Sequence, residues 1–155
     1  MSAGRDQDTR DAQAALSGTA ITSFRLNAQF LAVAEELSRP AGLTAARWQV
    51  LGAVLPQPLP AAGIARAMGI TRQSVQRIAD LLVEQGLAAW EPNPAHRRAK
   101  LLRPTAEGRA AVAAIEPGHA EFARRLAAEV GGTERLTAAL AALADLSAAL
   151  ERLAP

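Results

Sequence analysis

The chain of 155 residues fits one domain with a few appended helices, and 50% of it is hydrophobic. Aromatic residues make up only 3%, and alanine and leucine dominate, so a mainly α fold is predicted. The absence of cysteine excludes disulfides, thiol catalysis and thiolate metal sites. No apolar run approaches the roughly 18 residues of a membrane span, and the N-terminus lacks the apolar centre of a signal peptide. We therefore expect a cytoplasmic protein with no membrane span, cofactor or metal.

The formal net charge is only +2, but the basic residues are distributed unevenly. Residues 66–109 contain eight Arg or Lys against four Asp or Glu, while residues 1–65 are balanced and residues 110–155 are acidic. Lys100 is the only lysine. Arginine suits planar, bidentate contacts to guanine and phosphate, so this distribution favours nucleic-acid binding by the middle third.

Residues 1–18 are polar and mix acidic with basic side chains, so we interpret them as a flexible tail. A helix is predicted from about Thr19 to Ser38, where Arg39-Pro40 ends it. A surface helix needs only one apolar stripe, and this one has two. The second stripe predicts that residues 19–40 also pack on a partner chain. The two stripes consist of Ile21, Phe24, Ala28 and Leu31, and of Leu26, Phe30, Val33 and Leu37.

Thr44 is a good N-cap for the next helix, in which Trp48, Leu51 and Leu55 have the spacing of a buried face. Three prolines between residues 56 and 60 predict a rigid connector. A short helix over residues 61–68 then ends at Gly69, which supplies the positive φ of a sharp helix exit.

Residues 64–84 have the pattern of two helices that meet at a tight turn. Thr71 caps the second helix, whose buried face is predicted from i, i+3, i+4 and i+7 spacing to be Val75, Ile78, Ala79 and Leu82. The opposite face carries the hydrogen-bond donors Arg72, Gln73, Gln76 and Arg77. We predict a helix-turn-helix, in which this polar face suits a DNA major groove. Taken alone, the face could also be ordinary solvated surface.

A β-hairpin is predicted after this helix. Its strands lie near residues 87–91 and 99–103, and its tip spans residues 92–98. Thr105 then caps a helix that continues to about Val130 and that Pro117-Gly118 should kink or divide. The tip ends in adjacent arginines, which are poor core material and suit a phosphate backbone or minor groove.

Gly131-Gly132 is a clear helix stop, and Thr133 is expected to cap a last helix. A leucine stripe at spacings of three and four follows it: Leu136, Leu140, Leu143, Leu146, Leu150 and Leu153. This stripe could pack within the chain, but we favour a dimer interface, because the domain core is already supplied. Residues 117–155 are therefore assigned to dimerisation.

From about Leu43 to Val112 the chain resembles the MarR family of winged helix-turn-helix transcriptional regulators. The matching segments are LTAARWQVL, IARAMGITRQSVQRIADLLVEQGL and EPNPAHRRAKLLRPTAEG, in family order. The resemblance implies a winged helix-turn-helix domain over residues 41–116 with a short β-hairpin wing, flanked by N- and C-terminal dimerisation helices. It further implies a homodimer that grips a pseudo-palindromic operator on double-stranded DNA.

The chain departs from the family pattern at two positions. The family wing usually has an acidic residue that steadies the arginine reaching the minor groove, and His96 stands there instead. Either Arg97 or Arg98 finds another anchor, or the arginine is less ordered before DNA arrives. Pro104 replaces the usual leucine, which keeps the Thr105 cap but drops an apolar contact.

The first residues of a recognition helix lie nearest the bases. We therefore expect Arg72 to contact guanine and Gln73 or Gln76 to contact adenine. We expect a second group of residues to contact phosphates, which position the protein on DNA but carry no sequence information. These residues are Thr71, Ser74 and Arg77 on the helix, and His96, Arg97, Arg98 and Lys100 on the wing.

The family resemblance also implies a regulator, most often a repressor, released by a small aromatic or lipophilic acid. The pocket that binds this effector would lie between the dimer helices and the winged lobe. Its candidate residues are Phe24, Asn27, Phe30, Trp48 and His119. An enzyme is disfavoured, because the only histidines, His96 and His119, lack a nucleophile–base pair or metal-ligand spacing. A winged helix that docks proteins without operator specificity stays open as the alternative.

Overall fold

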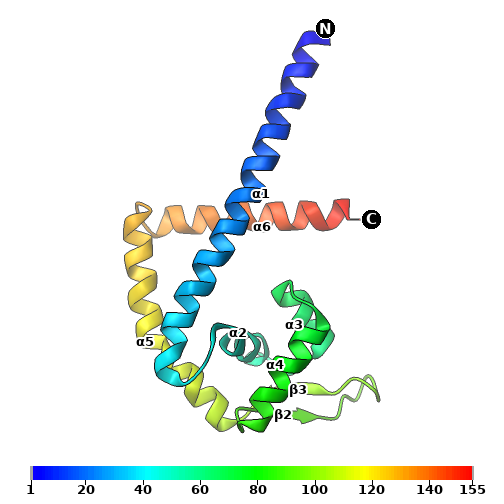
Figure 1. Ribbon diagram of the computed structural model, residues 1–155, viewed down its shortest axis with the longest axis vertical. Coiled ribbons are helices and arrows are strands. Elements are labelled where there is room, and N and C mark those ends of the chain that lie inside the picture. Colours follow the sequence, from blue (N-terminus) through cyan, green and yellow to red (C-terminus); the bar gives the residue numbers. More distant parts are fainter. Residues whose placement is uncertain (1, 155) are drawn as a thin grey trace. The chain divides into compact units, whose positions relative to one another are not determined.

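The computed structural model describes residues 2–154 and divides into two compact units, with the boundary between Ala114 and Ile115. The chain is mainly helical with a small antiparallel sheet, as predicted (Figure 1). The first unit contains α1 (Ser2–Ser38), a 3-10 turn (Arg39–Ala41), α2 (Ala45–Val54), β1 (Leu59–Pro60), α3 (Ala61–Met68), α4 (Arg72–Glu84), β2 (Ala88–Glu91) and β3 (Leu101–Pro104). Helix α5 (Ala106–Glu129) begins in the first unit and ends in the second, which also contains α6 (Thr133–Leu153).

Helix α1 begins at Ser2, so residues 2–18 of the segment interpreted as a flexible tail are helical in the structure. These residues contain no proline, and side chains four apart support the helix. The Gln7 amide donates to the Asp11 carboxylate at 2.9 Å, and Arg10 Nε donates to the Asp6 carbonyl at 3.1 Å. Figure 1 shows the N-terminal half of α1 extending away from α2, α3 and α4.

The core of the first unit lies where α2, α3 and α4 meet the hairpin. Nine hydrophobic residues there are at most 3% exposed: Val50, Leu51, Val54, Ile64, Val75, Ala79, Leu82, Ala88 and Leu102. The predicted buried face of α2 is only partly right, because Trp48 and Leu55 are half-buried while Val50 and Val54 are completely buried. Helix α2 is enclosed over a wider arc than one i, i+3, i+7 stripe covers.

The sheet has the order β1-β3-β2, and all its pairings are antiparallel. The hairpin prediction is confirmed, but β1 was not predicted, since residues 56–60 were interpreted as a rigid connector. Leu59 pairs with Leu102 and Pro60 with Leu101, so β1 fixes the start of α3 beside the root of the wing. Pro104 at the end of β3 is buried, so this position still supplies apolar surface despite the missing leucine.

Helices α1 and α2 are joined by a side-chain cap. The Glu35 carboxylate accepts a hydrogen bond from the Ala45 amide at 2.8 Å, and Thr44 Oγ1 accepts from the Arg47 amide at 3.2 Å. Two of the otherwise unsatisfied amides at the start of α2 are therefore paired, one of them by a residue of α1. The predicted Thr44 cap is confirmed.

In the second unit, α5 runs through Pro117 as a single helix, so Pro117-Gly118 does not divide it, and the alternative of a kink there stays a prediction. The N-cap of α6 is Gly132, with a φ of 122°, and the predicted cap Thr133 is the first helical residue instead. On α5, Arg124 donates to the Glu121 carboxylate from Nε at 3.1 Å and from Nη2 at 2.8 Å. This hydrogen bonding lowers the pKa of Glu121. Within residues 2–154, no helix combines the length and apolarity needed to cross a bilayer.

Candidate nucleic-acid interface

A tight turn positions α4 after α3. Gly69 has a φ of 65°, and the Ile70 amide donates to the Ala65 carbonyl at 3.2 Å, which closes α3 as predicted. Thr71 Oγ1 then accepts from the Ser74 amide at 3.1 Å and donates to Ser74 Oγ at 2.9 Å. The two hydroxyls are thus tied to each other at the start of α4, which presents its N-terminal end to solvent.

The two faces of α4 differ as the sequence pattern predicts. Val75, Ala79 and Leu82 are completely buried, while Ile78, the fourth residue of the predicted face, is half-buried. The polar face is exposed and carries Arg72, Gln73, Gln76 and Arg77. The helix is therefore held by one side while guanidinium and carboxamide groups face outward on the other.

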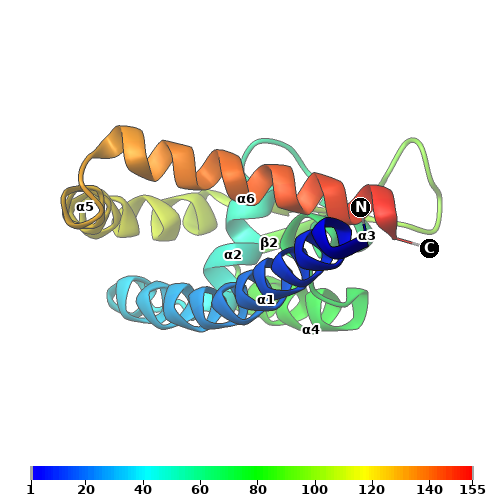
Figure 2. The same ribbon diagram turned by 90° about the horizontal axis from the view of Figure 1, so that it is seen from above.

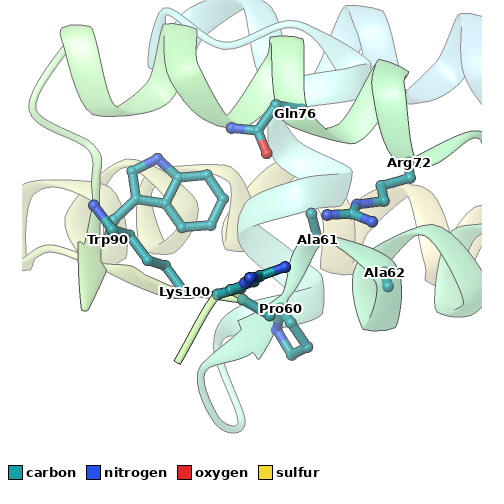
Figure 3. A pocket seen from close by; sticks show the side chains of 9 residues that line it. Pro60, Ala61, Ala62, Arg72, Gln76, Trp90 and Lys100 are labelled. Carbon is teal, nitrogen blue, oxygen red and sulfur yellow. The ribbon is translucent and has the colours of Figure 1, made fainter. Parts of the chain in front are cut away.

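A cleft of about 320 Å³ lies between this polar face and the root of the wing. Figure 3 shows Arg72 and Gln76 on one side of it, Lys100 and Pro60 on the other, and the indole of Trp90 at one end. Arg98 and the first residues of α3 also line it. Three cationic side chains, Arg72, Arg98 and Lys100, converge there from two elements. The lining contains no carboxylate, so the cleft is suited to an anionic partner.

The wing is the loop of residues 92–100 between β2 and β3, and Figure 2 shows it standing clear of the helices of its unit. Its tip is turned by Asn93, whose Oδ1 accepts from the Ala95 amide at 3.0 Å and whose carbonyl accepts from the His96 amide at 3.2 Å.

The acidic side chain at the end of β2 does not anchor the wing arginines. Glu91 pairs with Arg103 at 3.3 Å, across the two strands. Within residues 2–154, Arg97 and Arg98 form no ion pair. With His96 in place of the acidic residue, the alternatives were another anchor for Arg97 or Arg98, or an arginine that is less ordered before DNA arrives. Among the described residues, the structure shows no ion pair that would provide the other anchor.

The structure brings together only some of the predicted contact residues. Arg72, Gln76, Arg98 and Lys100 share the cleft. Gln73 and Arg77 lie along a neighbouring groove of α4 that also includes Gln76, Asp80 and Glu84. His96 and Arg97 are exposed at the wing tip and line neither the cleft nor the groove.

Sequence reasoning missed Trp90 and the edge formed by Pro60, Ala61 and Ala62. Trp90 could have been found from the alternation of β2, because it lies on the same strand face as the buried Ala88. The edge at Pro60 depends on the unpredicted pairing of β1 with β3.

The candidate effector residues are not enclosed by a single chain. Phe24 is 74% and Phe30 53% exposed on α1, Asn27 is exposed between them, and Trp48 on α2 is half-buried. His119 lies in the second unit and is exposed. Across residues 2–154, no group of three or more His, Asp or Glu side chains could hold a metal ion.

Comparison with known proteins agrees with this geometry. Residues 41–99 match the family model described as the MarR family. An uncharacterised protein of Mycobacterium bovis, Mb2034c, is 47% identical over 74 residues, which cover 48% of this chain and 52% of that protein. The matched region thus spans about half the length of this curated relative.

Solved structures match over more of the chain. Sco5413, a MarR family transcriptional regulator from Streptomyces coelicolor, is 29% identical with a TM-score of 0.71, over 88% of this chain and 96% of that one. CouR from Rhodococcus jostii, bound to p-coumaroyl-CoA, is 27% identical with a TM-score of 0.55, over 63% and 73%. The M. tuberculosis regulator MosR in complex with DNA shares the fold, at 24% identity and a TM-score of 0.69, over 84% and 96%. With its exposed recognition helix, its wing and these matches, the chain has the winged helix-turn-helix fold of the MarR family of transcriptional regulators, and its residues 41–99 match the model of that family.

Proposed function

We propose that this protein regulates transcription by binding a pseudo-palindromic operator as a homodimer, with sequence specificity. The observation that carries the proposal is the cleft between α4 and the wing. Arg72, Arg98 and Lys100 converge in it and form no ion pair within residues 2–154. An exposed helix with unpaired cations can enter a major groove, and cations on the adjacent hairpin can bind the flanking phosphates.

The individual roles follow from position on α4. Arg72, in the first turn, would contact a guanine, and Gln73 or Gln76 an adenine. Thr71, Ser74 and Arg77 would hold phosphates, and the wing residues His96, Arg97, Arg98 and Lys100 would bind the backbone or minor groove beside them.

The dimer is supported by apolar surface that one chain leaves uncovered. On α6, Leu140, Leu150 and Leu153 are 66%, 62% and 80% exposed, while Leu143 and Leu146 are 42% and 43% exposed. An exposed apolar stripe of this length favours a second copy of the chain over solvent. A two-fold axis would set the two α4 helices about 34–36 Å apart, one turn of DNA.

We further propose that the regulator represses and that a small aromatic or lipophilic acid releases it. CouR, 27% identical, was solved with an aromatic acyl thioester bound. Phe24, Asn27, Phe30, Trp48 and His119 would line the pocket once α1 packs in the dimer. The effector would act by favouring a dimer whose two α4 helices are mis-spaced for successive major grooves.

In vitro selection from a randomised duplex library, using the full chain, tests this function. Enrichment of an inverted repeat with half-site centres about 10 base pairs apart is expected. Binding that falls steeply with salt and shows no sequence enrichment would contradict operator recognition. No binding at all would favour protein docking. The Arg109→Ala variant is a matched control, because Arg109 is exposed and lies outside the cleft.

A further inference from the structure

The recognition face of α4 carries an internal hydrogen bond that no DNA contact requires. Gln76 Nε2 donates to Asp80 Oδ1 at 3.0 Å, and both side chains are exposed. The two residues are one helical turn apart on the same face. A carboxylate there is unexpected, because it repels the phosphates that the surrounding arginines would attract.

We propose that Asp80 is a positioning residue that sets which end of the Gln76 carboxamide faces the DNA bases; this inference rests on the proposed function. A carboxamide has a donor end and an acceptor end, which its neighbours must orient. An ionised carboxylate can only accept hydrogen bonds. Asp80 therefore holds the NH2 end of Gln76 and leaves its oxygen to the cleft.

Figure 3 shows how the Gln76 carboxamide lies in the cleft. The oxygen of Gln76 points into the cleft toward the space between Trp90 and Arg72, while the nitrogen points sideways along α4. Gln76 lines both the cleft and the groove that contains Asp80, so it bridges the two surfaces.

The orientation selects a base. In the major groove an outward oxygen accepts from an exocyclic amino group, which adenine and cytosine present in that groove and guanine and thymine do not. The NH2 group retains a second N–H after bonding to Asp80, and only adenine offers N7 beside its amino group to receive it. Gln76 held in this way is a reader of adenine, and its flipped form would favour guanine or thymine.

Asp80→Asn is the informative substitution, since asparagine has a donor end as well as an acceptor end. The Gln76 carboxamide would then populate both orientations. Asp80 is exposed and aspartate and asparagine have similar helix propensities, so folding is expected to be unaffected. Asp80→Glu keeps an acceptor-only group in reach and should keep the preference.

Glu84→Gln separates orientation from charge. Glu84 is exposed in the same groove of α4 as Asp80, but it has no hydrogen bond to Gln76. Its substitution by glutamine therefore removes the same charge as Asp80→Asn without changing a partner of Gln76. Both Asp80→Asn and Glu84→Gln should tighten binding to unrelated DNA, because each removes a phosphate repulsion. Only Asp80→Asn should change the base preference.

The experiment is selection from a randomised duplex library with the wild type, the three variants and the Gln76→Ala and Gln76→Ala/Asp80→Asn proteins. At one symmetric position of the half-site, Asp80→Asn should reduce the enrichment of adenine by roughly fivefold or more. Asp80→Glu and Glu84→Gln should leave it intact, and in the Gln76→Ala background Asp80→Asn should change affinity alone.

An unchanged base preference in Asp80→Asn, an equal change in Glu84→Gln, or a change that persists without Gln76 would each overturn the inference. A wild-type protein that enriches no sequence would instead sink the proposed function itself. The two failures are therefore distinguishable.

Discussion

The hydroxyl of Thr105 joins the start of α5 to the end of α4. It donates to the Gly86 carbonyl at 2.6 Å and accepts from the Gly108 amide at 3.1 Å. The Thr105 amide also donates to the Leu87 carbonyl at 3.1 Å. These three bonds close the wing at its root, because Gly86 and Leu87 precede β2 and Thr105 follows β3. The wing is thereby tied to the C-terminal end of the recognition helix.

Thr105→Ala removes both the helix cap and the bond to Gly86. We expect it to lower the free energy of unfolding by about 1–2 kcal/mol, the usual cost of losing an N-cap. Urea denaturation followed by far-UV circular dichroism measures this. Thr105→Ser keeps the hydroxyl and should lose much less. Equal losses in the two variants would show that the methyl group, rather than the hydroxyl, matters.

Gly108→Ala should destabilise the protein although it lies inside a helix. A Cβ at residue 108 would overlap the Leu87 carbonyl oxygen, a backbone atom that cannot move aside without shifting the wing root. This overlap outweighs the helix propensity of alanine, and we expect a loss of about 1–3 kcal/mol.

Gly52→Ala is the matched control for that substitution. Gly52 lies in α2, and an added Cβ there meets nothing within 4 Å. Alanine should therefore stabilise the protein by about 0.5–1 kcal/mol. If both variants gain stability in the same denaturation experiment, the close approach of α5 to Leu87 is not as tight as described.

The features of this site that could be predicted from the sequence are those that depend on residues close together in the chain. Thr71, Gly69 and the buried stripe through Val75 follow from capping and helical periodicity within a dozen residues. The cleft was not reachable in the same way. The cleft depends on β1, a strand of only two residues that gives no periodic signal in the sequence. This strand forms because Leu59 pairs with Leu102, which is more than forty positions away in the chain.

The N-terminal helix shows a different limit. Residues 2–18 have no apolar stripe, so periodicity offered no reason to predict a helix there. The helix is supported by paired polar side chains such as Gln7 with Asp11, whose individual contributions are small.

Arg72→Ala tests direct base reading. Arg72 is exposed in the first turn of α4 and lines the cleft. We expect a loss of about 1–3 kcal/mol on the selected operator and relaxed specificity at one base pair of each half-site. Fluorescence anisotropy titrations on the operator and its single-base variants measure both effects. An equal loss on every sequence would assign Arg72 to phosphate contact instead.

Arg98→Ala tests the wing. Because Arg98 is expected to contact phosphate, its loss should weaken binding to all sequences and reduce the slope of log K against log salt by about 1. The slope is obtained by repeating the titrations across a salt series. Arg109→Ala, which removes the same charge outside the cleft, should leave the slope unchanged. An unaltered slope in Arg98→Ala would remove the wing from the phosphate contacts.

Leu143→Glu tests whether the leucine face of α6 holds two copies together. Leu143 is 42% exposed at the centre of the stripe, between Leu140 and Leu146. A carboxylate buried there in a dimer would be unpaired in apolar surroundings, so the variant should sediment as a monomer and lose operator binding. Ala141→Glu adds the same charge to the opposite, exposed face of α6 and should remain dimeric. A dimeric Leu143→Glu protein would place the interface elsewhere, and a monomeric wild type that still binds a full inverted repeat would show that DNA itself assembles the pair.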